Sequence, residues 1–244
     1  MGIGPLLKTW RTKRRLSQLD LALEAGVSTR HLSFLETGRS RPSEQMVLHL
    51  AEQLDVPLRE RNRMLLAAGY APSYSQKPLE ELGSVKDALD QLLGSHEPFP
   101  ALVVDRGWNV VAANAAIPML TAGAAAHLLE PPINALRLTL HPEGMAPRIE
   151  NLGEWRAHLL RDLEVQIDTT GDEELAALLE ELRALPGPPG EPGAHEVFVP
   201  LRIDGLSFLS TRTTFATALD VTVSELAIEA FFPADRHTAH VLSR

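Results

Sequence analysis

Apolar residues recur at three- and four-residue intervals through the first seventy residues, a pattern typical of short amphipathic helices. Ser17 and Asp20 make a capping-box pattern at the start of the second helix. Gly26, Gly38 and Gly69 follow apolar stretches, where helices commonly end. The pattern predicts five helices, at residues 5–15, 17–26, 29–37, 44–55 and 58–69. The apolar face of the second helix is expected to comprise Leu19, Ala22 and Leu23.

Short β-rich runs and helical segments make up the rest of the chain. Two strands are predicted at Ala101–Val104 and Trp108–Ala112, with a turn between them. Helical patterns follow at residues 114–120, 123–129, 133–140, 152–167 and 171–185. A loop rich in Pro and Gly at 186–193 precedes three final strands, at 195–203, 206–217 and 221–235. In the last strand, residues 226, 228 and 230 are expected to face the core, and residues 225, 227 and 229 to face largely water.

These patterns predict the α+β class, with an all-α helix-turn-helix bundle followed by a five-stranded antiparallel sheet that carries helices on one face. The stretch from about residue 70 to 85 contains Pro, Ser and Tyr, which is typical of a linker. The predicted division is a helical domain at 1–70, a linker and linking helix at 71–90, and a domain built on the sheet at 91–244.

Charge divides the chain in a similar way. Residues 1–70 hold 11 basic and 7 acidic residues, a net charge of +4, whereas residues 71–244 hold 12 basic and 25 acidic residues, a net charge of −13. A basic segment on an acidic chain suggests contact with nucleic acid. The acidic remainder would repel DNA and confine the contact to the basic segment.

Several classes of protein are disfavoured by composition and motifs. No cysteine is present, so disulfides and thiolate metal sites are excluded. The most apolar window, 108–129, is interrupted by polar residues and Pro, so we expect no membrane span and a cytoplasmic protein. No HExxH, P-loop or GxSxG motif occurs, and an enzyme is not expected. His237 and His240 stand too far from other ligands to form a zinc site, and no metal is expected.

The second and third helices are joined by a short turn that contains Gly26, the arrangement of a helix-turn-helix. The third helix would enter the major groove of double-stranded DNA, while helix N-termini face phosphate. The candidate DNA-binding residues are Gln18, Ser28, Thr29, Arg30, Ser33, Phe34, Arg39 and Arg41. Phe34 could pack on a thymine methyl group or, equally, against a neighbouring helix.

Residues 16–43, LSQLDLALEAGVSTRHLSFLETGRSRPS, resemble the lambda-repressor and Cro type of helix-turn-helix, the XRE family. The shared features are Ser17-Gln18, the Gly26 turn, Val27-Ser28, and Glu36 followed by Gly38-Arg39 and Pro42. The resemblance implies that Gln18, Ser28 and Arg39 position the protein on phosphate and that the outward residues of the third helix read bases. One such unit reads a half-site, so a homodimer is expected.

The strand and helix order of residues 91–244 resembles a PAS-type sensor domain, and the whole chain resembles the MmyB-like transcription regulators. This resemblance is carried by ALVVDRGWNVVAANAA, HPEGMAPRIENLGEWRAHLLRDL and ALDVTVSELAIEAFFPAD, together with the helix-turn-helix. It implies a transcription regulator whose C-terminal domain binds a small apolar or amphipathic ligand, such as a fatty acid.

Several residues could form the ligand site. Asn134, Arg137 and His141 fall on one face of a predicted helix, and an Arg there, or Arg148 nearby, could hold a carboxylate. Candidate apolar lining residues are Trp155, Phe198, Phe208 and Phe215. The same residues could instead satisfy buried backbone groups or belong to the core. Two other functions stay open: a helix-turn-helix module that binds protein, and a sensor that holds haem or flavin, with His127 or His141 as a haem ligand.

Overall fold

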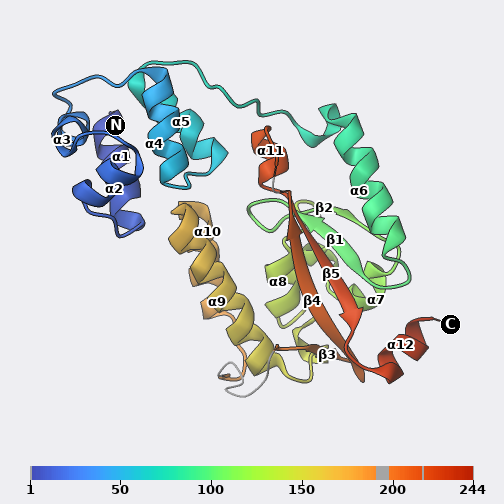
Figure 1. Cartoon of the computed structure of the whole chain (residues 1–244). Helices are drawn as coiled ribbons and strands as arrows, with labels where there is room; N and C mark the ends of the chain where they lie inside the picture. Colours follow the sequence, from blue (N-terminus) through green and yellow to red (C-terminus); the bar gives the residue numbers. More distant parts are fainter. Residues whose placement is uncertain (1, 191–197, 216, 244) are drawn as a thin grey trace. The chain divides into compact units, whose positions relative to one another are not determined.

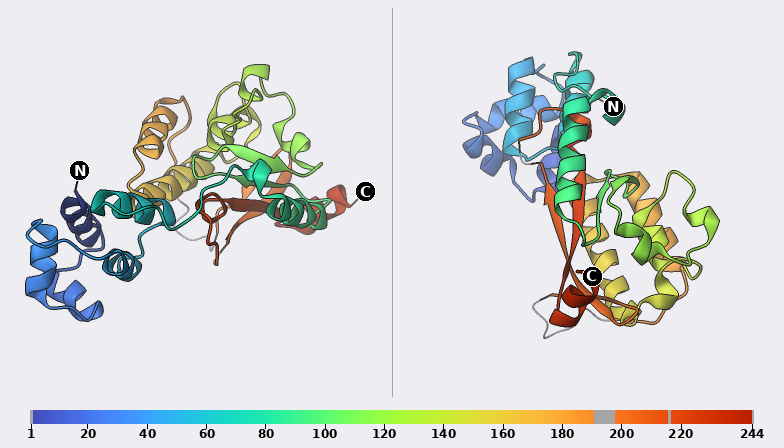
Figure 2. Two further views of the ribbon diagram at one scale, coloured as in Figure 1. Left: turned by 90° about the horizontal axis from the view of Figure 1, so that it is seen from above. Right: turned by 90° about the vertical axis from the view of Figure 1, so that its right-hand side faces the viewer.

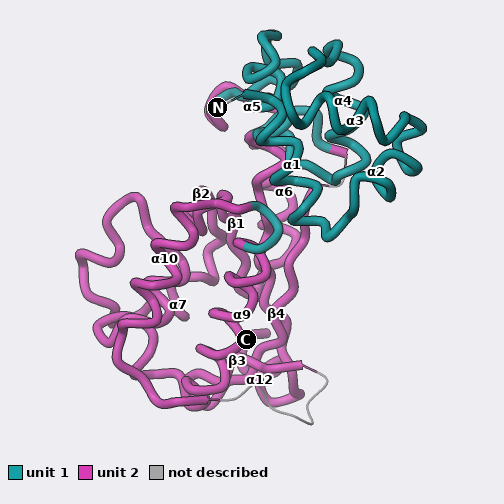
Figure 3. The backbone as a smooth tube through the Cα atoms, turned by 90° about the vertical axis from the view of Figure 1, so that its left-hand side faces the viewer, with its two compact units in different colours: residues 1–77, 168–170, 218–221 teal, residues 78–167, 171–217, 222–244 magenta. Residues whose placement is uncertain are grey.

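The computed structural model describes residues 2–190, 198–215 and 217–243, which form two compact units. One unit comprises residues 1–77 with 168–170 and 218–221, and the other comprises residues 78–167, 171–217 and 222–244 (Figure 3). Among the described residues, no helix is both long and apolar enough to cross a membrane.

The first unit is a bundle of five helices, as the hydrophobic pattern predicts (Figure 1). The helices are α1 (Ile3–Lys13), α2 (Gln18–Glu24), α3 (Thr29–Glu36), α4 (Glu44–Gln53) and α5 (Leu58–Ala68). The hydroxyl group of Ser17 accepts a hydrogen bond from the Asp20 backbone N–H, and the Asp20 carboxylate accepts one from the Ser17 N–H, so the predicted capping box is confirmed. Gly26 has φ +64°, which lets the chain turn sharply between α2 and α3.

The apolar face predicted for α2 is wrong at two positions. Leu19 and Leu23 are 56% and 72% exposed, whereas Leu21 is fully buried. Leu21 and Ala22 join the buried cluster that fills the bundle, together with Leu32, Leu35 and Leu50. Helix α2 packs through one narrow stripe, and a seven-residue helix is too short for the periodicity alone to identify that stripe.

The second unit is built on a five-stranded antiparallel sheet in the order β2-β1-β5-β4-β3, which confirms the predicted sheet. The strands are β1 (Ala101–Val104), β2 (Val110–Ala113), β3 (Leu201–Ile203), β4 (Leu206–Thr214) and β5 (Ala227–Pro233). The central strand β5 therefore lies between β1 and β4, from opposite ends of the unit's sequence. The β3–β4 hairpin turns at Asp204-Gly205, both with positive φ.

Helices cover both faces of this sheet, so the expectation of one covered face is wrong. Helix α6 (Gly83–Ser95) packs on one face through Leu89 and Leu93, against Ala101, Val103 and Ile228. Figure 2 (left) shows the sheet between α6 and the helices of the other side. Those helices are α7 (Ile117–Thr121), α8 (Ala135–Leu140), α9 (Leu152–Thr170) and α10 (Glu173–Ala184), with the short helices η2 (Ala126–Leu128) and η3 (Ala146–Arg148). The remaining elements are η1 (Leu79–Glu81), α11 (Val221–Ser224) and α12 (Arg236–Leu242).

The final predicted strand needs two corrections. Its first residues, Val221–Ser224, form the helix α11, and the strand β5 begins only at Ala227. Glu229, expected to face water, is only 9% exposed because it lies on the face of β5 opposite α6, and the helices on that side cover it. Residues 191–197, part of the predicted loop and of the strand at 195–203, lie outside the described residues.

Candidate ligand pocket and DNA-binding surface

Helix α3 presents a cationic surface built around one aromatic ring. The guanidinium carbons of Arg30 and Arg39 lie 5.3 and 5.9 Å from the centre of the Phe34 ring. Both arginines are exposed and Phe34 is half-buried. Within the described residues, the apolar cluster of this unit does not include Phe34, so the ring supports two cations rather than the core. This stack fixes two long side chains that could otherwise adopt many rotamers.

A buried ion pair holds helices α1, α2 and α3 together. The Arg11 guanidinium on α1 donates to the Glu36 carboxylate at the end of α3, with Nε to Oε1 at 2.6 Å, and Gln18 Nε2 on α2 donates to Glu36 Oε2 at 2.7 Å. Burial alone would raise the pKa of Glu36, but the hydrogen bonds from Arg11 and Gln18 outweigh burial, and the pKa is lowered. The Gln18 amide group therefore donates one N–H inside the bundle, which leaves its second N–H for the predicted contact with phosphate.

The other candidate DNA-binding residues lie on or near α3. The Ser28 hydroxyl group caps α3 by accepting from the His31 N–H at 3.1 Å. Thr29 and Ser33 are half-buried on α3, and Arg41 is exposed in the loop after it. The side chains on α3 and at its two ends form one polar and cationic surface, which we call the α3 surface: Ser28, Thr29, Arg30, Ser33, Phe34 and Arg39. The Arg41 guanidinium lies apart from it, beside Gly69 at the end of α5.

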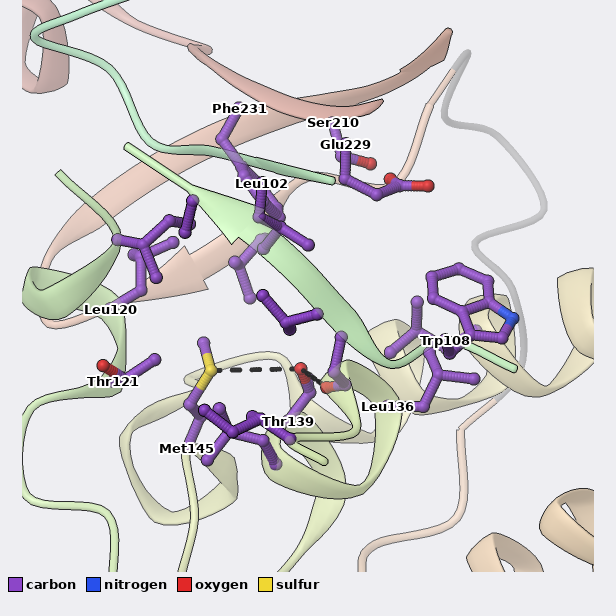
Figure 4. Close-up of a pocket in the computed structure, with 18 of the residues that line it drawn as sticks. Leu102, Trp108, Leu120, Thr121, Leu136, Thr139, Met145, Ser210, Glu229 and Phe231 are labelled. Atoms are coloured by element: carbon purple, nitrogen blue, oxygen red, sulfur yellow. Dashed lines mark hydrogen bonds between the residues drawn. The ribbon is translucent and has the colours of Figure 1, made fainter. Parts of the chain in front are cut away.

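The second unit encloses a cavity of about 190 Å³ between the sheet and the helices α7, α8 and α9 (Figure 4). Most of its lining side chains are aliphatic or aromatic, and a few are polar. The lining residues are Leu102, Trp108, Val110, Ala113, Ile117, Leu120, Thr121, Leu129, Ile133, Ala135, Leu136, Leu138, Thr139, Met145, Trp155, His158, Leu159, Asp162, Leu201, Ser210, Arg212, Glu229 and Phe231. A pocket that is mainly apolar with a few convergent polar groups is typical of a small-molecule site.

One set of polar groups in the pocket comes from neighbouring positions across the sheet. Leu102 on β1 pairs with Glu229 on β5, and Glu229 pairs with Arg212 on β4, so these three side chains share the face that lines the cavity. The Arg212 guanidinium donates a hydrogen bond to the Glu229 carboxylate. The neighbouring pair, Ser210 and Phe231, lies on the same face. Figure 4 shows Ser210 and Glu229 together at the sheet side of the pocket, away from Met145 and Thr121.

Trp108 is held by a strained backbone at one end of the pocket. Its φ of +66° is rare for a bulky residue, and such conformations often occur at functional sites. An Asx turn supports it, because the Asp105 carboxylate accepts from the backbone N–H groups of Gly107 and Asn109 at 2.8 and 2.9 Å. The Trp108 ring is buried, and the Arg212 guanidinium carbon lies 4.3 Å from its centre. The indole N–H of Trp108 donates to Gln166 Oε1 at 2.9 Å.

Helix α9 contributes a second set of polar atoms along one face. Trp155, His158 and Asp162 follow at intervals of three and four residues, and all line the cavity. His158 Nε2 lies 3.8 Å from Asp162 Oδ2. Trp155 is 3% exposed, and its indole N–H has no hydrogen-bond partner among the described residues. A buried donor without a partner is rare, and this N–H is itself covered by protein atoms, so it is not exposed in the cavity.

Glu229 is a pocket carboxylate whose pKa is raised. Burial raises the pKa of Glu229, the nearby Arg212 opposes that rise, and the Asp162 carboxylate adds to it. The ion pair with Arg212 therefore only partly compensates for removing the carboxylate from water. A ligand that changes this ion pair would also change the proton affinity of Glu229.

None of the four polar residues predicted for the ligand site, Asn134, Arg137, His141 and Arg148, lines the cavity. Asn134 is buried and caps α8: its Oδ1 accepts from the Arg137 N–H, and its Nδ2 donates to the Gly107 carbonyl. Arg137 forms a two-point ion pair with Glu181 on α10, at 2.6 and 2.8 Å, on the protein surface. His141 ends α8, where its ring lies against that of His127.

The other residues predicted for the ligand site lie in different parts of the second unit. Arg148 pairs with Asp204 and donates to backbone carbonyl groups around Leu120. Its guanidinium N–H groups therefore join these two segments of the chain. Trp155 lines the cavity, as stated above. Phe208 is fully buried in the core, Phe215 packs in the cluster beneath α6, and Phe198 is 46% exposed.

One pocket residue that was not predicted, Arg212, could have been identified from the alternation of residues in β4. In β4, Phe208, Ser210 and Arg212 alternate with residues of the other face, so a core-facing Phe208 places Arg212 on the same face. The sequence of β4 therefore suggested an inward arginine. Glu229 gave no such signal, because its burial depends on helices distant in sequence.

Two family models match the chain in the two regions just described. The MmyB-like transcription regulator ligand binding domain matches residues 85–244, which include every pocket residue. The Helix-turn-helix family matches residues 7–61, which include the α3 surface. No curated protein matches the chain. The resemblance seen in the sequence is thus confirmed, and the chain belongs to the MmyB-like transcription regulators, with a helix-turn-helix at residues 7–61 followed by their ligand-binding domain at residues 85–244.

Proposed function

We propose that this DNA-binding transcription regulator senses a small, mainly apolar ligand with one polar end, held in the cavity between the sheet and helices α7–α9. The observation that carries the proposal is a largely apolar cavity whose sheet side carries the ion pair of Arg212 and Glu229. A fatty acid is one ligand of this class. The division of the chain at 1–70, 71–90 and 91–244 and the PAS-like character of the sheet remain predictions.

The sheet side of the cavity favours a ligand head group that accepts hydrogen bonds. Arg212 lines the cavity and offers a guanidinium that a carboxylate could engage at two points. A carboxylate at Arg212 would compete with Glu229 for the same cation. Because burial already raises the pKa of Glu229, its protonation on ligand binding would remove that competition.

The size of the cavity limits the ligand. An apolar cavity of ~150 Å³ is large enough for benzene. The cavity here, about 190 Å³, therefore accommodates a ring or a short alkyl chain, and a long chain would extend through the mouth or displace a wall. We therefore expect short and medium chains to bind without rearrangement of the walls.

The α3 surface supports the second half of the proposal, recognition of double-stranded DNA by Gln18, Ser28, Thr29, Arg30, Ser33, Phe34, Arg39 and Arg41. Arg30 and Arg39 would contact bases or phosphate, with Phe34 holding them in place. We propose a homodimer, because each helix-turn-helix reads one half-site. Ligand binding would then alter the DNA affinity by favouring one arrangement of the dimer.

Mass spectrometry tests the sensing proposal directly. The purified full-length protein is measured under native conditions, and its organic extract is analysed for small molecules. The proposal expects a bound amphipathic molecule and no visible absorbance. A haem or flavin in the spectrum would favour the chromophore alternative, and the proposed ligand class would then be wrong.

A matched pair of variants tests whether a bound molecule occupies the cavity. Ala113 is exposed at the edge of the cavity on β2, so Ala113→Phe fills the mouth without overpacking the core. Ala115 is also exposed but does not line the cavity, and Ala115→Phe is the control. The proposal expects Ala113→Phe to lose the bound molecule and Ala115→Phe to keep it. Equal occupancy in both variants would place the molecule outside the cavity.

A further inference from the structure

Two histidines and a glutamate meet beside the pocket but outside its lining. His127 lies in η2, His141 ends α8, and Glu143 lies in the turn that follows. One potential ligand atom from each of these side chains lies within 4.8 Å of the other two. The two imidazole rings are 5.7 Å apart between centroids and nearly perpendicular, at 81°. We infer that His127, His141 and Glu143 form a binding site for a divalent transition metal ion, best suited to Zn²⁺.

The backbone brings these side chains together before any ion arrives. The Gly144 N–H donates to the His141 carbonyl at 2.9 Å and closes the turn that carries Glu143. The Ala125 N–H donates to the Glu143 carbonyl at 2.8 Å and fixes the segment of His127 against this turn. Gly144 is required by packing, because a Cβ atom there would lie 2.1 Å from the Leu138 carbonyl oxygen. A site on such supported segments needs little reorganisation to bind an ion.

The ligand types identify the class of ion. Imidazole nitrogens suit Zn²⁺, Ni²⁺, Co²⁺ and Cu²⁺, whereas Ca²⁺ and Mg²⁺ prefer oxygen ligands. Two histidines and one carboxylate supply three ligands of a tetrahedral zinc site and leave the fourth position for water. Here His141 Nδ1 accepts a hydrogen bond from the Glu143 backbone N–H at 3.1 Å. An ion bound to this nitrogen would replace that hydrogen bond.

The ion would link two walls of the pocket. The segment before His127 supplies Thr121 to the cavity, and Leu129 follows it, while the segment around His141 supplies Thr139 and Met145. Figure 4 shows Thr121 and Met145 on the same side of the cavity. A metal ion joining His127 to His141 and Glu143 would hold these segments together and slow their opening. The inference does not depend on the proposed ligand, since none of the three side chains lines the cavity.

Metal titration of the full-length protein, prepared without a histidine tag, tests the site. Co²⁺ is added while visible absorbance is followed, and the affinity for Zn²⁺ is measured by competition with a chromophoric chelator. We expect one saturable site and a visible Co²⁺ band that Zn²⁺ removes. Hydrogen exchange of residues 121–129 and 141–145 is expected to slow when Zn²⁺ binds. Titration without saturation, or without any Co²⁺ band, would overturn the inference.

Variants assign the ligands. His127→Gln and Glu143→Gln change exposed side chains, so folding is expected to be retained. Each variant, and His141→Gln, should weaken Zn²⁺ binding by about tenfold or more, since loss of a group that merely supports a ligand already costs ~10–100-fold. His237→Gln, on the exposed surface of α12, is the control and should bind as the wild type does. Wild-type affinity in both His127→Gln and Glu143→Gln would overturn the inference by placing the ion elsewhere.

Discussion

Glu229 is a buried carboxylate whose charge is expected to decide which ligands the pocket accepts. When ionised, it neutralises Arg212, the residue best placed to hold an anionic head group. Its pKa is raised by burial, so the folded protein takes up a proton at Glu229 more readily than the unfolded chain does. For this group, stability is greatest below the ordinary pKa of a glutamate and is lost as the pH rises through the raised pKa of the folded state.

The same titration should govern anion binding. A medium-chain alkyl sulfate, which stays ionised across the range, should bind more tightly as the pH falls towards the raised pKa of Glu229, because the protonated side chain releases Arg212. Glu229→Gln should remove most of this pH dependence and strengthen binding near pH 8 by about tenfold, the equivalent of ~1.4 kcal/mol. Calorimetric titration between pH 5 and pH 8 measures both effects.

His158 and Asp162 are the other ionisable side chains, besides Arg212, that line the cavity. His158→Gln is therefore the control, and we expect it to keep the pH dependence that Glu229→Gln removes. An unchanged pH profile in Glu229→Gln would show that Arg212 and Glu229 do not form the polar end of the ligand site.

Arg30 and Arg39 are expected to carry much of the DNA affinity. If the arginine contacts a base, replacing it with Ala should weaken binding to a selected operator by ~1–3 kcal/mol. If it contacts a phosphate, the replacement should lower the slope of log K against log salt concentration by about one. Fluorescence anisotropy measured at several salt concentrations distinguishes a base contact from a phosphate contact. Arg63→Ala removes an exposed arginine of α5 and is the control. Loss of affinity in Arg63→Ala equal to that in Arg30→Ala would indicate that α3 has no special role.

At the scale of the helices, Glu36 ties α1, α2 and α3 together through Arg11 and Gln18. Both partners of the ion pair are largely buried, so removing one charge leaves the other without compensation. Glu36→Gln should lower the free energy of opening of these helices by about 3 kcal/mol. Hydrogen exchange of the α1–α3 amides measures that energy, and Glu24→Gln, at an exposed position of α2, should change it little.

The pH dependence of this ion pair has the opposite sign to that of Glu229. The pKa of Glu36 is lowered in the folded protein, so its contribution is complete above the ordinary pKa of a glutamate and is lost as the pH falls through the lowered value. In the wild type, protection of α1–α3 should fall at acidic pH, and in Glu36→Gln that part of the loss should be absent. Equal acid sensitivity in both proteins would contradict the assigned role.

Local patterns predicted most elements but not which strand faces are covered. The helices of the first unit and the β3–β4 hairpin follow from periodicity, capping residues and Asp204-Gly205, all of which act over a few residues. Alternation in β5 could not identify a wet face, because α6 covers one face and α8 and α9 approach the other. The row that joins Leu102 to Glu229 and Arg212 brings together residues more than a hundred positions apart. Only the strand order reveals that row.

At the scale of the whole molecule, charge should confine DNA contact to the N-terminal region. Residues 1–70 carry +4 and the remainder −13, so the acidic part repels phosphate. We expect two chains to bind one operator, at half-sites about 34 Å apart or a multiple of that distance. Selection from random DNA duplexes, followed by native mass spectrometry of the complex, measures the number of chains bound. One chain per duplex at saturation would contradict the proposed homodimer.

Tryptophan fluorescence tests the central claim, a ligand bound in the cavity of the second unit, most directly. The chain has three tryptophans, and Trp108 and Trp155 line the cavity, so Trp10→Phe leaves only the two reporters of the pocket. Fatty acids of increasing chain length are titrated into Trp10→Phe and into the same protein with Ala113→Phe. We predict a saturable change in emission that Ala113→Phe abolishes. No saturable change at any chain length, or the same change in both proteins, would contradict the claim.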